Sequence, residues 1–271
     1  MNSRFNRQPL SDEQIREVAP SVFNGRPHQS ASSRYSFIST AEVLSGLRQS
    51  GYEVFSATQS IVKQENNSLF AKHSLNLRLA GTDLANVGDI AMGVLLTNSH
   101  DTSSAFALAF SIFRLACSNG LVVADSSIQS LHLRHQGDLV NRVVVGTQDL
   151  LGRGPEVLET VKQWKQITLT AGESKIFAEE AHSLRFEENS NLALAIKPES
   201  LLKINRSQDS GSDLWSIFNR TQENCLVGHI RGYRADGRRV KSQSIKSIDV
   251  SNKLNKSLWS LAAKMAELKT A

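Results

Sequence analysis

Residues 89–125 constrain the fold more than any other part of the sequence, because three apolar segments follow one another within them. Ile90–Thr97 is an unbroken run of a length and composition typical of a buried strand. Ser103–Ser118 is apolar on nearly every side when it is drawn as a helix, a pattern typical of a helix in the core. Leu121–Ala124 predicts a second short strand. The stretch therefore predicts a strand, a central buried helix and another strand.

The polar segment Asn98–Thr102 separates the first strand from the predicted central helix. Its Asn, Ser, Asp and Thr side chains are of the kinds that cap helix N-termini, so we expect a capping and hydrogen-bonding corner. Acid–base chemistry by His100 with Asp101 is the alternative. Adjacent residues rarely point the same way, and neither a nucleophile motif nor a metal-ligand spacing accompanies the pair. His132 and His135 would face opposite sides of a strand, so we expect no metal centre there.

The rest of the pattern places strands towards the front of the chain and helices towards the back. The further predicted strands are Tyr52–Lys63, Phe70–Leu79 and Ile128–His135. Helices are expected after capping boxes at Ser11 and Ser39, and over Asp138–Leu151, Pro155–Gln166, Ala171–Arg185, Ser212–Cys225 and Lys253–Lys269. Such segregation defines the α+β class. We expect an N-terminal antiparallel sheet packed on the central buried helix in a domain of residues 1–136, followed by a mainly helical region, residues 137–271.

Composition argues against several classes of protein. Apolar residues make up 40% of the 271, enough for a sizeable core, and no apolar run approaches the ~20 residues that cross a membrane. Cysteine occurs only twice, which excludes a disulfide scaffold and favours the reducing cytoplasm. No glycine-rich phosphate loop is present, so ATP- or NAD-dependent chemistry is not expected. We expect a cytoplasmic protein that has no cofactor, metal, membrane partner or enzymatic activity.

Positive charge is concentrated near the C-terminus. Residues 201–271 carry 13 Lys and Arg against 6 Asp and Glu, whereas the first 200 residues carry 18 against 20. The predicted basic loop at residues 228–250 contains most of the excess, with Asp236 as the one acid between residues 231 and 246. Its cations are Arg231, Arg234, Arg238, Arg239, Lys241 and Lys246. This asymmetry is typical of polyanion-binding proteins, although a solvated basic surface gives the same pattern.

Nucleic acid is the polyanion that the chemistry of this loop favours. Guanidinium groups match phosphate geometry, and Tyr233, placed among the cations, can stack on a base. Gly232 and Gly237 let the backbone approach a ligand closely. Secondary phosphate contacts, on faces that we expect to be exposed, are Lys63, Lys72 and Arg78. A mobile loop kept soluble by its charge is the alternative.

Short motifs are spread over nearly the whole chain. They are Pro20–Phe23, Arg34-Tyr35, Leu96–Asp101 with Ser103-Ser104, Phe113-Arg114, Cys117–Val122, His135–Asp138, Asp213–Trp215, Gln222–Asn224, Ile248-Asp249 and Asn255–Trp259. In order and spacing they resemble the domain-of-unknown-function 932 family, which prophages and plasmids encode. Thr102 departs from the family motif, which usually reads Asn-Ser-His-Asp-Gly. The resemblance implies a mobile genetic element but no agreed activity, and marks a family-motif corner of Asn98, His100, Asp101, Arg114 and Asn119.

A looser resemblance concerns the order of elements. Between Tyr35 and Gly120 the expected helix, hairpin, third strand and long helix are similar to the core of Rad52-type single-strand annealing proteins. Those proteins need no nucleotide cofactor, form rings or filaments and hold single-stranded DNA in a basic groove. The resemblance implies a homo-oligomer that anneals or protects single-stranded DNA during recombination or replication. Because fold does not fix function, two alternatives remain. One is a counter-defence or regulatory protein that binds a host protein, and the other is a hydrolase using His100, Asp101 and His135.

Overall fold

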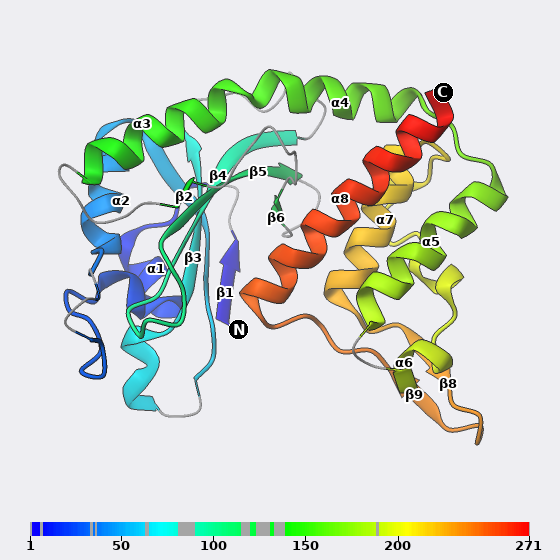
Figure 1. The fold of residues 1–271 in the computed structure, drawn as a ribbon, viewed down its shortest axis with the longest axis horizontal. Helices are drawn as coiled ribbons and strands as arrows, with labels where there is room; N and C mark the ends of the chain where they lie inside the picture. Colours follow the sequence, from blue (N-terminus) through cyan, green and yellow to red (C-terminus); the bar gives the residue numbers. More distant parts are fainter. Residues whose placement is uncertain are drawn as a thin grey trace. The chain divides into compact units, whose positions relative to one another are not determined.

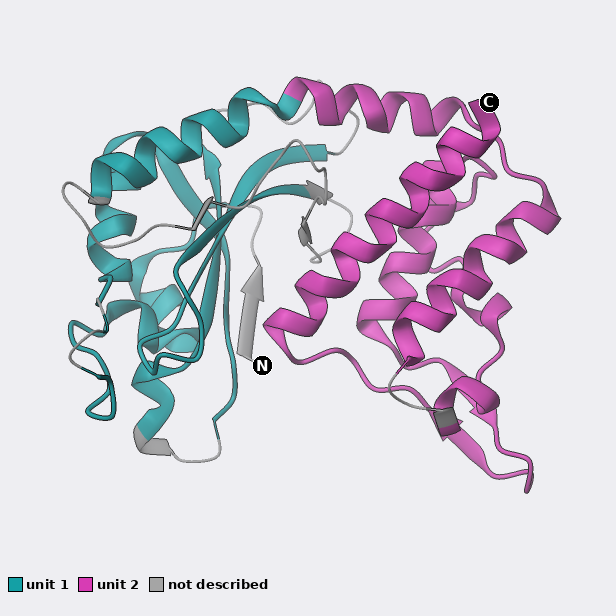
Figure 2. Cartoon of the chain, in the orientation of Figure 1, with its two compact units in different colours: residues 1–154 teal, residues 155–271 magenta. Residues whose placement is uncertain are grey.

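The computed structural model describes residues 2–5, 8–32, 35, 37–62, 65–80, 90–114, 120–122, 131–132, 139–187 and 190–270. The chain divides into two compact units, residues 1–154 (unit 1) and 155–271 (unit 2), as Figure 2 shows. The boundary expected from the sequence is residue 136. The difference arises because the helix that follows residue 138 packs on the sheet and on a helix of unit 1.

Unit 1 is an antiparallel sheet with helices packed on it (Figure 1). The strands, in sheet order, are β1 (Asn2–Phe5), β2 (Tyr52–Gln59), β3 (His73–Leu79), β4 (Ile90–Asn98), β5 (Ala107–Arg114) and β6 (Gly120–Val122), with β7 (Leu131–His132) paired to β5. The helical elements are α1 (Asp12–Val18), α2 (Thr40–Gln49) and α3 (Leu139–Gly152), with 3₁₀ turns η1 (Pro20–Phe23) and η2 (Glu65–Phe70). The predicted α+β class and N-terminal antiparallel sheet are confirmed.

The central helix predicted over Ser103–Ser118 is wrong, because Ala107–Arg114 forms strand β5. This strand pairs with β4 along its whole length. Residues 115–118 lie outside the described part of the chain. The Rad52-type order of elements therefore does not extend to its long helix, since a strand occupies that place.

Burial on both faces explains the error over β5. Leu108, Phe110 and Ile112 lie on one face of the strand and are at most 1% exposed. On the other face Ser111 is equally buried, and the small apolar residues Ala107 and Ala109 are half-buried. The Ser111 hydroxyl donates to Asn76 Oδ1 across the sheet at 3.0 Å. A strand covered on both faces is apolar on all sides, as a core helix is, and hydrophobic periodicity cannot distinguish the two.

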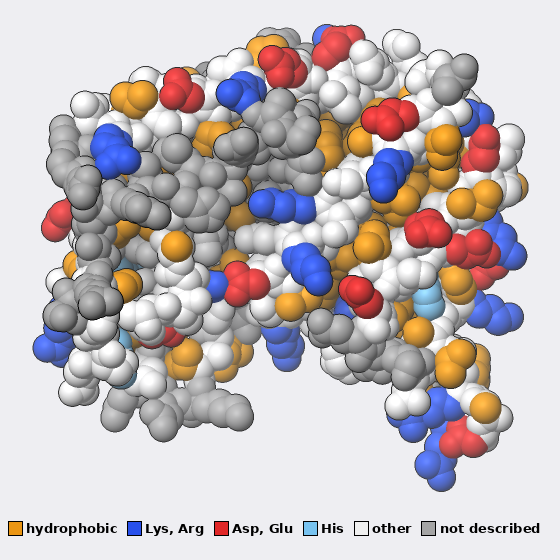
Figure 3. Space-filling model, in the orientation of Figure 1, with side chains coloured by type: hydrophobic (Ala, Val, Ile, Leu, Met, Phe, Trp, Pro, Cys, Tyr) orange, Lys and Arg blue, Asp and Glu red, His pale blue; other side chains and the backbone are white. Residues whose placement is uncertain are grey.

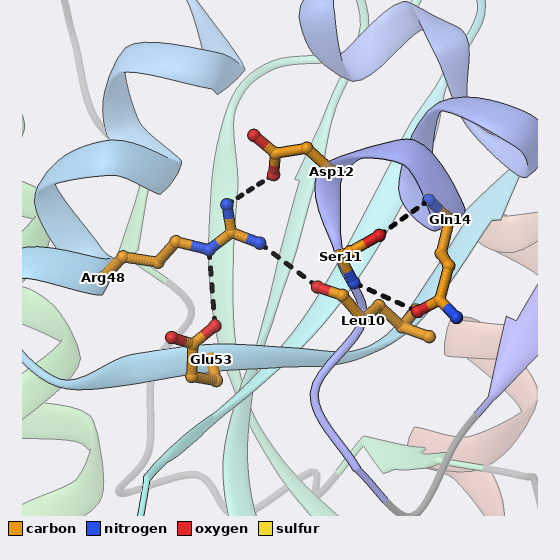
Figure 4. A network of polar contacts seen from close by, with 6 residues as sticks. All are labelled: Leu10, Ser11, Asp12, Gln14, Arg48 and Glu53. Atoms are coloured by element: carbon orange, nitrogen blue, oxygen red, sulfur yellow. Dashed lines mark hydrogen bonds and ion pairs between the residues drawn. The ribbon is translucent and has the colours of Figure 1, made fainter.

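Arg48 connects three elements near the start of unit 1 (Figure 4). Its guanidinium, on α2, pairs with Asp12 on α1 and with Glu53 on β2, where the N–O distance is 3.3 Å, and donates to the Leu10 carbonyl at 3.2 Å. Beside it, the predicted capping box is confirmed, because Gln14 N donates to Ser11 Oγ while Ser11 N donates to the Gln14 side chain. These bonds position α1 and α2 beside the sheet.

Unit 2 is mainly helical. Its elements are α4 (Gly154–Gln166), α5 (Ala171–Phe186), α6 (Ser190–Ala195), η4 (Pro198–Leu202), η5 (Ser207–Asp209), α7 (Leu214–Val227), β8 (Arg231–Tyr233), β9 (Arg239–Lys241) and α8 (Ile248–Thr270). With α3 in unit 1, these helices confirm the five that the sequence predicts after residue 137, although α8 begins earlier than expected. Among the described residues, no helix combines the length and the apolar composition needed to cross a bilayer.

Aromatic rings fill the core of unit 2. Phe218 on α7 is fully buried, and its ring centre lies between 5.6 and 6.0 Å from those of Trp164, Trp215 and Trp259. Trp164 and Trp259 are themselves 4.4 Å apart. Rings at these distances contribute both apolar burial and favourable ring–ring geometry, so this cluster joins α4, α7 and α8.

Replacing Phe218 with Ala tests the aromatic core. The variant should lose about 3–5 kcal/mol of unfolding free energy in unit 2, because it leaves a cavity among three indole rings. Tryptophan fluorescence during urea unfolding reports on this unit alone, since all three tryptophans of the sequence lie in it. Leu268→Ala is the control, because Leu268 is 77% exposed and should change stability by no more than about 0.5 kcal/mol. Equal effects of the two substitutions would contradict the packing.

Candidate nucleic-acid interface

The predicted basic loop is a β-hairpin. Strands β8 and β9 are antiparallel, with Arg231 opposite Lys241 and Tyr233 opposite Arg239. The turn closes with Arg234 N donating to the Arg238 carbonyl at 2.9 Å, and Gly237 has a φ of 79°, in the left-handed region that this turn requires.

One face of the hairpin is exposed and cationic. Side chains alternate between the two faces of a strand, so Arg231, Tyr233, Arg239 and Lys241 share one face, and all four are exposed. We call this set the basic face. Figure 3 shows Lys and Arg side chains gathered at the hairpin, at the lower right of the view. The basic face therefore places three cations around one aromatic ring.

The opposite face of the hairpin lies against α6. Gly232 is buried there, and a Cβ atom added to it would lie only 2.1 Å from the Ala195 carbonyl oxygen. Val240, its cross-strand partner, is half-buried. Close packing of this face leaves the basic face as the one that reaches solvent.

Hydrogen bonds hold the base of the hairpin. Ser242 is fully buried, its hydroxyl accepts from Ile230 N at 3.1 Å, and its own N–H donates to the Ile230 carbonyl at 2.9 Å. Arg185 on α5 donates to the Cys225 and Gln243 carbonyls, both at 2.8 Å, and so joins the end of α7 to the chain that leaves β9. The hairpin is thus anchored at its base and exposed at its turn.

Like charges face each other across the hairpin. Arg231 lies directly opposite Lys241, an arrangement that is destabilising unless an anion lies nearby. Asp236 compensates little, because it accepts from Arg238 N at 3.0 Å and pairs with the Arg238 side chain at 3.5 Å, where both side chains are largely exposed. Arg234 and Lys246 are exposed as well. The cations that the sequence places in this region are all available to a ligand.

Of the secondary phosphate contacts predicted near the first hairpin, those within the described residues are not exposed in the same way as the cations of the β8–β9 hairpin. The prediction that Arg78 is exposed is wrong. Arg78 lies on β3, an interior strand between β2 and β4, and its side chain is 2% exposed. Its guanidinium lies 3.6 Å from the centre of the Phe55 ring, and burial lowers its pKa to about 10. Lys72 is half-buried, and Lys63 lies outside the described residues. Arg78 therefore cannot contact a phosphate from this position.

The polar segment predicted to cap a helix instead joins buried segments of unit 1. Asn98, the last residue of β4, donates from Nδ2 to the Ile38 carbonyl at 3.0 Å and to Thr40 Oγ1 at 2.9 Å. Thr40 Oγ1 also lies 2.8 Å from His73 Nε2, and His73 Nδ1 lies 2.8 Å from Ser21 Oγ. The capping interpretation is wrong, but the hydrogen-bonding corner is confirmed.

His100 is enclosed in this corner. Its side chain is fully buried, with ring centres of His73 at 5.2 Å and Phe37 at 4.9 Å. Neither ring nitrogen meets full hydrogen-bond geometry with a described residue, although a contact with the Ser21 backbone partly offsets the effect of burial on the pKa of His100. Burial lowers the pKa of His100 to about 4, and burial together with the neighbouring His100 lowers that of His73 to about 3. Both rings are therefore neutral at pH 7.

Asp101 caps the backbone that follows it. Partial burial would raise its pKa, but hydrogen bonds from Ser103 outweigh that effect and hold the pKa below its ordinary value. Ser103 N donates to Asp101 Oδ1 at 2.9 Å. The carboxylate lies in the same loop as His100, but its hydrogen bond is to the loop backbone.

The structure does not bring the whole predicted corner together. Arg114 pairs with Ile90, the first residue of β4, whereas Asn98 is the last, about 25 Å away along the strand. Asn119 and His135 lie outside the described residues. Within the described part of the chain, no group of three His, Cys, Asp or Glu side chains could hold a metal ion.

Several residues of this corner were not predicted from the sequence. Ser21, Gln59 and His73 form a buried hydrogen-bonded chain, in which Ser21 Oγ donates to Gln59 Oε1 at 2.6 Å. The Tyr35 hydroxyl donates to the Ser99 carbonyl at 2.9 Å. Ser21 and Tyr35 belong to the short motifs quoted above, and this was the one sign in the sequence that they matter. They lie far from Asn98 in the sequence, so their contact with this segment could not be predicted.

Comparison with known proteins confirms the family resemblance. The model of the domain of unknown function DUF932 matches residues 27–259, and the chain belongs to this family. Two similar relatives are the UPF0380 proteins YfjQ and YafZ of Escherichia coli (strain K12). Each is 32% identical over 255 residues, which cover 94% of this chain and 91% of the relative. No solved structure gives a significant match.

The neutral histidine pair predicts acid sensitivity. Because both folded-state pKa values lie below the ordinary 6.5, the unfolded chain binds more protons, and stability present above pH 6.5 is lost as pH falls towards 4. Each ring contributes a slope of up to roughly 1.4 kcal/mol per pH unit. Urea unfolding followed by circular dichroism between pH 7.5 and 4.5 measures this. His100→Phe should make the dependence shallower, and an unchanged slope in that variant would contradict a neutral buried His100.

Thr102 predicts a stabilising substitution. It is exposed with a φ of 67°, where a β-branched residue is strained and glycine is not. Thr102→Gly should stabilise unit 1 by about 1 kcal/mol after the entropy of glycine in the unfolded chain is deducted. Amide hydrogen exchange in β4 and β5 reports the change. Ser103→Gly, at a neighbour without positive φ, should be neutral or destabilising, and loss of stability in Thr102→Gly would show that the strain is absent.

Proposed function

We propose that this protein binds nucleic acid through the β8–β9 hairpin, with single-stranded DNA as the favoured ligand. The observation that supports the proposal most strongly is the basic face, where Arg231, Arg239 and Lys241 surround Tyr233 and no carboxylate pairs with them among the described residues. Arg234 and Arg238 extend the same positive charge to the turn. Phosphate groups would relieve the repulsion between Arg231 and Lys241 and form charge-assisted hydrogen bonds with the guanidinium groups.

The proposed role is annealing or protection of single strands during the recombination or replication of a prophage or plasmid. This role needs no nucleotide cofactor, which agrees with a sequence that lacks a phosphate loop. It operates in the cytoplasm, and assembly of several copies would align several hairpins along one strand. Avidity of that kind strengthens binding without any new contact.

Salt dependence tests the proposal. Binding of labelled single- and double-stranded oligonucleotides is measured by fluorescence anisotropy over a series of salt concentrations. Each single-strand phosphate contact contributes about 0.7 to the slope of log affinity against log salt. The variant with Arg238, Arg239 and Lys241 changed to Ala should therefore bind more weakly and lose about 2 from that slope.

A charge-matched control separates specific contacts from net charge. Lys162, Lys165 and Lys264 are exposed cations on α4 and α8, and their joint replacement with Ala removes the same charge. Figure 1 shows α4 at the end of unit 2 opposite to β8 and β9. This control should keep most of the affinity and the slope. Absence of binding at low salt would refute the proposal, and a nuclease-resistant complex with a host protein would then favour the regulatory alternative.

A further inference from the structure

Tyr233 is exposed in a position that no packing requirement explains. Its side chain is 60% exposed, and within the described residues it makes no hydrogen bond or ring contact. The residue opposite it, Arg239, and the residue two positions before it, Arg231, direct their side chains to the same face. An exposed ring that contributes nothing to either core is available to a ligand.

Its surroundings favour a nucleobase over other flat ligands. On one face of an antiparallel pair, directly opposite residues have Cβ atoms roughly 5 Å apart, so the Arg239 guanidinium can reach a phosphate attached to a base that lies on the ring. Arg231 and Lys241 form the next cross-strand pair and are placed for a neighbouring phosphate. One stacked base flanked by phosphates matches this arrangement of one ring and three cations.

We propose that Tyr233 is a base-stacking residue and that it makes the hairpin prefer unpaired strands to duplexes. The inference rests on the proposed nucleic-acid binding and adds the residue and the contact that would make the basic face prefer single strands. In a duplex the bases already stack on one another, so the ring gains contact only with an unpaired base. Every base has a π-face, and the preference is therefore for single strands in general and not for one sequence.

The base contribution can be measured apart from the phosphates. Two labelled strands of equal length are compared, one of thymidines and one with abasic sites throughout, because both carry the same phosphates. Wild type should bind the thymidine strand roughly tenfold more tightly, as expected for one stacked base. Tyr233→Leu should bind both strands with the lower affinity, and Tyr233→Phe should keep the preference because it keeps the ring.

Controls make each outcome decisive. Circular dichroism and tryptophan fluorescence check that the variants fold, which is expected since Tyr233 lies in neither core. Leu194→Ala removes another exposed apolar side chain, 89% exposed on α6, and should leave the preference intact. Equal binding of both strands by wild type, or a preference that persists in Tyr233→Leu, would overturn the stacking inference while leaving the phosphate contacts standing. Binding to neither strand would overturn the proposed function itself.

Discussion

The close approach of Gly232 to the Ala195 carbonyl decides which face of the β8–β9 hairpin reaches solvent. Side chains alternate along a strand, so a face that packs on α6 leaves Arg231, Tyr233, Arg239 and Lys241 on the other side. Any Cβ at position 232 would force the hairpin away from α6. Because the fold fixes the backbone of this face before a ligand arrives, binding costs little backbone ordering, and only the exposed side chains have to be ordered.

The corner around His100 has the opposite character. Its polar groups are turned inward, and those of Ser21, Thr40, His73 and Asn98 are bonded to one another or to backbone. The His100 ring contacts Phe37 and His73 and is closed to solvent. Such a network specifies how α2, β3, β4 and η1 meet, since a buried polar group left unbonded is costly. The Asn98–Asp101 motif, which suggests acid–base chemistry in the sequence, is thus explained by its structural role in unit 1.

The sequence predicted the long helices well, but it missed strands β1, β8 and β9 and assigned β5 to a helix. The reason for the error over β5 is physical. Helices such as α2 and α4 have a periodic apolar face, and α2 begins after the expected cap at Ser39, so their pattern has one interpretation. Strand β5 carries apolar residues on both faces except at Ser111 and at its last residue, Arg114, and its composition suits a core helix equally well. Arg78 was misplaced for a similar reason. Alternation predicts an exposed face only where the strand has one, and β3 is buried on both faces from His73 to Arg78.

The motifs on which the family resemblance rests and the residues that we propose for binding fall in different places. Trp215 and Trp259 belong to the aromatic core, Gln222 donates to Asn255 in the interior at 2.9 Å, and Asn98 holds the corner. The cations of the hairpin contribute to neither core. A relative could therefore keep every motif, and hence the fold, while its hairpin carried a different charge. Membership of the family goes with the architecture of this chain, whereas the proposed ligand depends on the side chains of residues 231–241.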